Sequence, residues 1–173
     1  TTEVVEYVQG VTHDSIPDDV RDELHRCIVD GLAVMLSGSR AACSRIIHQY
    51  IRDAGTAGVS AAVGTDIVTS SSLAALANGV AGHADDFDDT QLAQTPDRIY
   101  GLLTHPTVPA LAAAMAVGQE VGANGKEFFT AFCAGFEVEC KIAEAMNPDH
   151  YIKGFHTTAT IGVFASAMAA AKL

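Results

Sequence analysis

The sequence predicts a mostly α-helical fold, and three features of the chain indicate it. Apolar residues recur every three or four positions in several segments, as they do on the buried face of an amphipathic helix. The chain has 15 glycines, no tryptophan and only 6% aromatic residues, which suits helices packed closely through small side chains. Proline, asparagine and glycine stand where the periodic segments begin and end. We therefore expect an all-α domain with, at most, a short β-hairpin near residues 59–69.

Apolar periodicity in the N-terminal half predicts helices at residues 2–8, 16–38, 44–54 and 70–82. The second of these is the longest, and it begins with a proline and two acidic residues, which favour a helix N-terminus. Glycines end the second and third helices, and a run of three serines can cap the fourth. The intervening residues 59–69 alternate in a way that is consistent with a hairpin.

The C-terminal half begins with residues 91–103, which have no period and predict a loop of about a dozen residues; loops of this length often carry function. Helices are then expected from Pro106 to Gly122, from Asn124 to Asn147 and from Thr157 onward, with a loop at residues 149–153. The spacing of the apolar side chains places five of them in the core: Leu24, Ile28, Leu32, Phe132 and Phe136.

Charge and cysteine usage limit the class of protein. The net charge of −11 argues against nucleic acid and anionic membranes as partners. None of the four cysteines forms a CxxC pair, and three lie in apolar helical patterns, so we expect buried, reduced thiols in a cytoplasmic protein. No apolar run approaches the roughly 20 residues that span a bilayer. The last apolar helix stops without a cap, so we expect the chain to be part of a longer domain.

One short stretch, residues 83–90 (HADDFDDT), concentrates the ionisable groups of the chain. It follows a small, apolar helix, so it can carry its four carboxylates to a cleft. Three interpretations are open: a metal site, a solvated acidic loop, or a site in which one carboxylate and Thr90 bind a substrate or orient a histidine. The stretch does not follow the calcium-loop order, since it lacks the glycine and the closing glutamate.

Two histidines, His105 and His156, each stand directly before a predicted helix. Helix N-termini present free N–H groups and a positive dipole end, both of which suit a carboxylate ligand. A nearby carboxylate would hold an imidazole in one tautomer, as general acid–base catalysis requires. The alternative is that both histidines are structural. The chain contains no GxSxG, phosphate-loop, HExxH or dinucleotide-binding motif.

These motifs, taken together and in order, resemble the MmgE/PrpD family, which includes 2-methylcitrate dehydratase, cis-aconitate decarboxylase and iminodisuccinate epimerase. The residues that carry the resemblance are Asn78-Gly79, His83, the stretch 86–90, His105-Pro106 and the stretch 154–160. The resemblance covers essentially all 173 residues. It implies the N-terminal part of a helical domain, without the smaller α+β domain that the family inserts later in its chain.

The resemblance also implies a homodimeric enzyme that needs no metal and no other cofactor. Its active-site residues would be Asp86, Thr90, His105 and His156, and we take Thr157 and Lys153 as candidate substrate-binding residues. Further lysines of the family lie beyond this chain. The segment 91–103 is longer than the spacer of the dehydratases and decarboxylases, which leaves the substrate open.

The expected function is that of a lyase that dehydrates or decarboxylates a small di- or tricarboxylate through a carbanion-like centre. Such a centre needs a general base, an acid and donors that hold carboxylates. The alternatives are an isomerase or epimerase of the same family and a non-catalytic helical interaction module. We expect the isolated 173-residue piece to be inactive and prone to association, because it would expose apolar surface.

Overall fold

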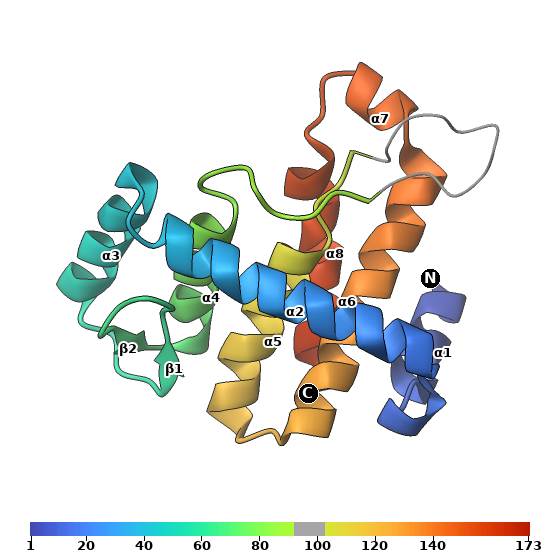
Figure 1. The fold of residues 1–173 in the computed structure, drawn as a ribbon, viewed down its shortest axis with the longest axis horizontal. Coiled ribbons are helices and arrows are strands. Elements are labelled where there is room, and N and C mark those ends of the chain that lie inside the picture. Colours follow the sequence, from blue (N-terminus) through green and yellow to red (C-terminus); the bar gives the residue numbers. More distant parts are fainter. Residues whose placement is uncertain (92–102) are drawn as a thin grey trace.

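A computed structural model describes residues 1–91 and 103–173 of the chain (Figure 1). The described part is mainly helical, as the sequence predicts. Its elements are α1 (Thr2–Gly10), η1 (His13–Ser15), α2 (Asp18–Gly38), α3 (Ala42–Ala54), β1 (Ser60–Ala61), β2 (Val68–Thr69), α4 (Ser71–Gly82), α5 (Thr107–Val121), α6 (Gly125–Met146), α7 (Asp149–Ile152) and α8 (Thr157–Lys172). The one-turn helix α7 replaces the loop expected at residues 149–153, because Ile152 and Lys153 donate backbone hydrogen bonds to Pro148 and Asp149. The predicted loop at residues 91–103 lies mostly outside the described residues.

Helix α5 is the centre of the fold and packs against α2, α4, α6 and α8. Its alanines are small enough for neighbouring helices to approach on several sides, and Ala110, Leu111 and Ala114 are fully buried. Helices α6 and α8 also pack closely (Figure 1). A Cβ at Gly135 of α6 would lie 2.6 Å from the carbonyl oxygen of Ala165 in α8. Small side chains therefore set the helix spacing, as the composition indicates.

The predicted core is confirmed except at one position. Leu24 and Phe132 are buried, and Ile28 and Phe136 are partly buried against the same core. Leu32 is 36% exposed, so its assignment to the core was wrong. The buried stripe of α2 instead continues through Gly31, Met35 and Gly38. Helix α2 has a glycine where it approaches its neighbours most closely. A search for periodic apolar side chains does not count glycine, so it does not detect these positions.

The predicted β-hairpin is present as two strands of two residues each. Ser60 pairs with Thr69, and Ala61 pairs with Val68, in an antiparallel register. The buried amide of Asn78 in α4 holds this hairpin: its Nδ2 donates to the carbonyl of Ala61 at 3.1 Å, and its Oδ1 accepts from the backbone N–H of Val63 at 2.8 Å. The hairpin thus covers one side of α4 and leaves its C-terminal end, where the acidic stretch begins, to the other helices.

Gly38 marks the tightest approach of α2 to α4, and we expect Gly38→Ala to lower the free energy of unfolding by about 2–3 kcal/mol. A Cβ there would lie 1.9 Å from the carbonyl oxygen of Ala81, which is backbone and cannot rotate away. Gly79→Ala is the matched control, because no atom of the described residues lies within 4 Å of its added Cβ. That variant should gain about 0.5–1 kcal/mol from helix propensity. Urea unfolding of both variants would measure the difference, and equal stabilities would contradict the close approach.

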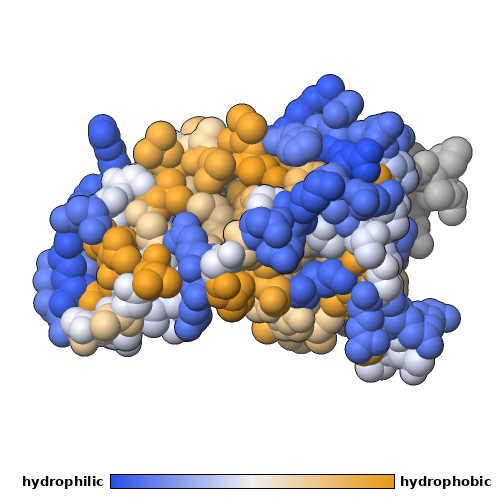
Figure 2. Space-filling view, turned by 90° about the horizontal axis from the view of Figure 1, so that it is seen from below, coloured by the Kyte–Doolittle hydropathy of each residue, from blue (hydrophilic) through white to orange (hydrophobic). Residues whose placement is uncertain are grey.

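No single helix in residues 1–91 and 103–173 has both the length and the apolar character needed to cross a bilayer. Helices α2 and α3, which meet at a bend of 82°, reach that length and apolar character only when they are taken together. Apolar surface is nevertheless present. Figure 2 shows hydrophobic residues gathered over the middle of one face, with hydrophilic residues towards its ends. Across the described residues the exposed apolar side chains include Val29 and Leu36 of α2 and Val163 and Phe164 of α8.

Candidate active site

The acidic stretch begins where α4 ends, and its four carboxylates have four different environments. Asp85 is exposed and accepts a hydrogen bond from Ser37 Oγ of α2 at 3.1 Å. Asp89 accepts from the hydroxyl of Thr107 at 2.8 Å and from its backbone N–H at 3.3 Å, so it caps the start of α5. Burial raises the pKa of the Asp89 carboxyl above its usual range. These two residues tie the stretch to α2 and α5 and leave Asp86 and Asp88 beside the histidines.

Asp88 joins two imidazoles. Its side chain is only 1% exposed, and its Oδ1 lies 2.9 Å from Nδ1 of His83. Its Oδ2 lies 3.4 Å from Nδ1 of His105, and its backbone carbonyl accepts from the same nitrogen at 3.2 Å. All of these partners are acceptors, so we assign a proton to Nδ1 of both histidines. A buried carboxylate needs such donors to offset the loss of water.

The third histidine, His156, also lies beside His83. The ring centroids of His83 and His105 are 4.9 Å apart, and those of His83 and His156 are 5.8 Å apart. His105 and His156 are therefore at most 10.7 Å apart, the sum of these two distances. Thr158 of α8 brings the elements together, because its Oγ1 accepts from the backbone N–H of His105 at 2.9 Å. Of the three imidazoles, those of His83 and His156 line the cavity described below.

His156 has the opposite hydrogen-bond pattern from the other two. It is the N-cap of α8, and its Nδ1 accepts from the backbone N–H of Ala159 at 3.2 Å. An imidazole nitrogen that accepts carries no proton, so neutral His156 is protonated on Nε2. Neutral His83 and His105, protonated on Nδ1, instead leave Nε2 as the acceptor nitrogen, which in His105 lies 3.8 Å from Asp86 Oδ1. The cluster thus combines a proton donor with proton acceptors, the requirement of general acid–base chemistry.

A cavity of about 780 Å³ opens beside this cluster. His83, Asp88, His156 and Thr158 supply its polar lining, while α4 and α5 contribute apolar side chains such as Val108. The volume lies in the range of small-molecule sites, and the mixture of an apolar wall with a few convergent polar groups is typical of them. The geometry supports this cavity as the active-site candidate.

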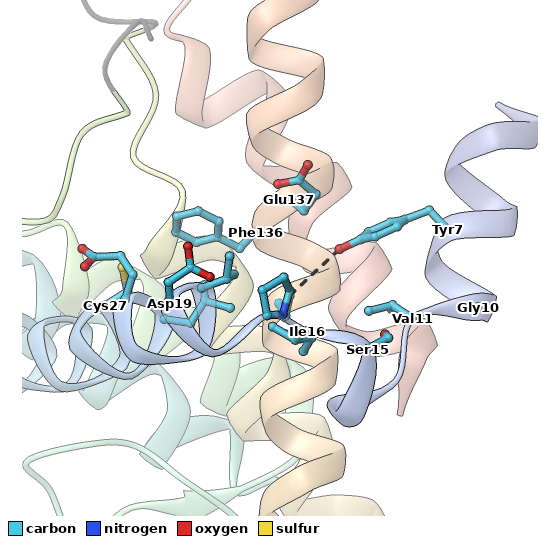
Figure 3. A pocket seen from close by; sticks show the side chains of 14 residues that line it. Tyr7, Gly10, Val11, Ser15, Ile16, Asp19, Cys27, Phe136 and Glu137 are labelled. Carbon is cyan, nitrogen blue, oxygen red and sulfur yellow. Dashed lines mark hydrogen bonds between the residues drawn. The ribbon is translucent and has the colours of Figure 1, made fainter.

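Figure 3 shows a second pocket, of about 640 Å³, that lies between α1, η1, α2 and α6. Apolar side chains line most of it, and the hydroxyl of Tyr7 contacts Sγ of Cys133 at 4.0 Å (dashed line). Burial raises the pKa of both Tyr7 and Cys133, which keeps them protonated at neutral pH. Because no histidine lines this pocket, it lacks the proton-transfer groups of the first cavity.

The predicted site residues do not all lie at the histidine cluster. Alongside the two predicted histidines, Asp86 Oδ1 lies 3.8 Å from His105 Nε2 and 3.9 Å from His83 Nδ1, with its side chain 77% exposed. Its φ of 56° is in the left-handed region, which directs the chain around the histidines. Thr90 is exposed and Lys153 is exposed, each without a contact that ties it to the cluster in the described residues. Thr157 is buried, and its hydroxyl donates to Asn147 Oδ1 at 3.3 Å, whereas the neighbouring Thr158 lines the cavity.

Sequence reasoning missed two members of the cluster as functional residues, His83 and Asp88. Both stand in the stretch that it singled out, so the signal was present. The spacing of five residues between them allows the bond from His83 Nδ1 to Asp88 once the chain turns after α4. The sequence does not predict that turn, because the turn depends on a positive φ at Asp86, which is not a glycine.

The four side chains of His83, Asp86, Asp88 and His105 could also hold a metal ion, because one ligand atom from each lies within 4.8 Å of the others. Imidazole and carboxylate together suit a borderline cation such as Zn²⁺. The sequence-based expectation was that no metal is needed. The hydrogen bond from His83 Nδ1 and the 3.4 Å contact with His105 Nδ1 give the buried Asp88 carboxylate polar partners other than an ion.

We therefore expect turnover of the intact protein to be unchanged after treatment with a chelator. Added Zn²⁺ should inhibit, since it would compete with protons for the imidazole nitrogens. Metal analysis of the purified protein, combined with assays before and after chelation, measures both effects. Activity that is lost in chelator and restored by a divalent ion would overturn the metal-free interpretation.

Known proteins resemble this chain over nearly its whole length. The profile of the MmgE/PrpD N-terminal domain matches residues 2–173. Human cis-aconitate decarboxylase is 30% identical over 171 residues, which cover 95% of this chain and 34% of the relative. A cis-aconitate decarboxylase-like protein of Aspergillus oryzae is 28% identical over 175 residues (100% of this chain, 36% of the relative). The cis-aconitate decarboxylase of Aspergillus terreus is 27% identical over 176 residues (100% and 35%).

The chain spans about a third of the length of these relatives. The match to the domain profile nevertheless extends over nearly every residue of the chain, from α1 to the last residue of the sequence. It includes both the helical core and the histidine cluster. This chain belongs to the MmgE/PrpD family and corresponds to its N-terminal domain.

Proposed function

We propose that this chain contributes the acid–base groups of a lyase that dehydrates or decarboxylates a small di- or tricarboxylate. The observation that carries the proposal is the buried Asp88, which contacts Nδ1 of two imidazoles, beside a third imidazole whose Nδ1 accepts a hydrogen bond. The relatives, which are named as cis-aconitate decarboxylases or as similar to them, support the substrate class.

The surroundings of the cavity suit a carboxylate substrate. Helix α8 directs its positive N-terminal end towards the cluster through His156, and Thr158 adds a hydroxyl to the lining. An exposed lysine, Lys153, stands just before this helix. The chain itself is strongly acidic, so a substrate with two or three carboxylates needs more positive charge than these groups supply. We propose that lysines from the rest of the protein provide it, as the family resemblance implies.

For dehydration, we assign His105 as the general base. Its Nε2 takes a proton from the carbon next to a substrate carboxylate, and the electron pair of the broken C–H bond forms the carbon–carbon double bond. The bond to the hydroxyl group then breaks, and His156 Nε2–H protonates that oxygen so that it leaves as water. The Asp88 carboxylate offsets the positive charge that develops on His105.

For decarboxylation, the carbon–carbon bond to the departing carboxylate breaks, and its electron pair stays on the substrate as a carbanion. His156 Nε2–H is placed to protonate that carbon. For an epimerase, the base and the acid would act on opposite faces of one carbon. Dehydration and epimerisation use both the base and the acid, whereas decarboxylation uses the acid alone. The cluster therefore supports the reaction class, and a substrate assay must distinguish its members.

Assays of the intact protein against methylcitrate, cis-aconitate and iminodisuccinate test the proposal. Loss of water, release of CO₂ and inversion without net loss identify the dehydratase, decarboxylase and epimerase respectively. The proposal fails if none of these compounds, nor a wider set of di- and tricarboxylates, is turned over or bound. We further propose a homodimer, which the exposed apolar surface supports; light scattering of the intact protein would give its mass.

A further inference from the structure

A buried carboxyl group that the proposed mechanism does not use lies one layer behind the histidine cluster. Glu139 is in the middle of α6 and is fully buried. Its Oε1 accepts a hydrogen bond from Thr104 Oγ1 at 2.7 Å. Among the described residues its Oε2 has no hydrogen-bond partner. Burying a carboxyl group without a full set of hydrogen bonds costs free energy. Its presence on an otherwise apolar helix face therefore indicates a specific role.

The partner of Glu139, Thr104, is the residue directly before His105. Thr104 is itself fully buried, and its carbonyl accepts from the backbone N–H of Gln91 at 3.0 Å. The side-chain amide of Gln91 in turn donates to the carbonyl of Cys140, the neighbour of Glu139, at 3.4 Å. Two consecutive residues of α6 thus hold both the segment that follows the acidic stretch and the segment that carries His105.

The backbone just before Thr104 needs such an anchor. Leu103 has a φ of 57°, in the left-handed region that a branched side chain adopts only at a cost. A hydrogen bond that fixes the next residue on the buried side selects this conformation over relaxed alternatives. On the other side, Thr158 holds the N–H of His105. The imidazole is therefore placed by one contact from α6, through Thr104, and by one from α8.

We propose that Glu139 is a positioning residue for His105, which it holds through Thr104 at the distance that lets Asp88 accept from its Nδ1. The importance of this role for turnover rests on the proposed function, while the structural link does not. The requirement is for a neutral, acceptor-bearing side chain. A glutamine meets that requirement and an alanine does not.

Burial raises the pKa of Glu139 to about 8, with a smaller contribution from the charge of Asp89. The other titratable group beside it is the thiol of Cys140 on α6 itself, while α8 presents Gly162 at this point. The carboxyl is therefore neutral at pH 7. Since the folded protein holds this proton more tightly than the unfolded chain, stability should be greatest below the usual pKa of glutamate and fall as the pH rises to about 8. Glu139→Gln should flatten that fall in melting temperature.

Three variants of the intact protein test the link. Glu139→Gln keeps the acceptor and should retain kcat within about threefold. Glu139→Ala and Thr104→Val each remove the hydrogen bond and should lower kcat by roughly 10- to 100-fold with little change in KM, because misplacing a catalytic group costs rate more than binding. Thr104→Val conserves volume and leaves Glu139 in place, so it decides the question even if Glu139→Ala does not fold. Glu137→Gln, on the same helix but half-exposed, is the control.

Nitrogen-15 spectra of the histidine side chains give a readout that a merely structural role would not move. We expect the His105 signal to shift or broaden in Thr104→Val and Glu139→Ala and to match the wild type in Glu139→Gln and Glu137→Gln. Unchanged His105 signals in both disrupted variants would overturn the proposal, as would equal loss of kcat in Glu139→Gln and Glu139→Ala. If the wild type turns over no polycarboxylate, the proposed function fails, and the spectra still decide the positioning role.

Discussion

Replacing His105 or His156 by alanine is expected to lower kcat of the intact protein by roughly 10²–10⁴-fold, the usual contribution of one proton-transfer group. The reason is the complementary protonation of the two rings. His105 offers Nε2 as the acceptor nitrogen because Asp88 holds its Nδ1, and His156 offers an Nε2–H because Ala159 donates to its Nδ1. Neither ring can take over the other's role without giving up the hydrogen bond that fixes it. Steady-state kinetics on the preferred polycarboxylate measures the loss.

His48→Ala is the matched control. This histidine lies on α3, where burial lowers the pKa of its imidazole, and it lines neither of the two cavities described here. Its kcat should remain within about twofold of the wild type. In a dehydratase or epimerase, His105→Ala should also stop exchange of the substrate's carbon-bound hydrogen with solvent, whereas His156→Ala should allow it to continue. Near-normal rates in both cluster variants would rule out the proton-transfer assignment.

The sequence predicted the helices because their cores follow a helical period, and it failed where packing depends on the absence of a side chain. Leu32 fits the apolar stripe of α2, yet it is exposed, and the close contact is made by Gly31. A Cβ at Gly31 would lie 2.6 Å from Leu111 Cδ2. The identity of the neighbouring helix, and hence the side of α2 that must be small, is a tertiary property that the local pattern does not contain.

The candidate site was predicted only in part, again because its geometry depends on tertiary structure. Histidines that precede helices can be recognised in a sequence, and His105 and His156 both lie within reach of His83 in the structure. The sequence does not show which acidic residue contacts the histidines, because Asp86 and Asp88 lie two positions apart in one stretch. The left-handed backbone at Asp86 leaves its side chain exposed, whereas Asp88 is buried between the imidazoles. Asp86 remains a candidate through its 3.8 Å contact with His105.

Asp88→Asn is expected to lower kcat by about 10²–10⁴-fold, the range for removing the carboxylate that orients a catalytic imidazole. The amide has nearly the same shape, so the fold should persist. Its oxygen can accept from only one of the two Nδ1–H groups, and its NH₂ group would face the other. His105 keeps the backbone carbonyl of residue 88 as an acceptor for its Nδ1–H, so the NH₂ group forces a tautomer change only where it faces His83, which must then move its proton to Nε2. In either orientation the imidazolium formed in the reaction loses its counter-charge.

Two neighbouring variants make the Asp88 result specific. Asp85→Asn changes an exposed carboxylate that accepts from Ser37 and touches no histidine in the described residues, so kcat should remain within about twofold. Asp86→Asn should impair turnover less than Asp88→Asn, since Asp86 is exposed and its contacts with His83 and His105 are longer. In nitrogen-15 spectra, a change of imidazole tautomer is expected in Asp88→Asn alone, and there only at His83. If Asp86→Asn instead caused the larger loss with both tautomers intact, the exposed carboxylate would be the group that acts on substrate, and Asp88 would serve only to hold the fold.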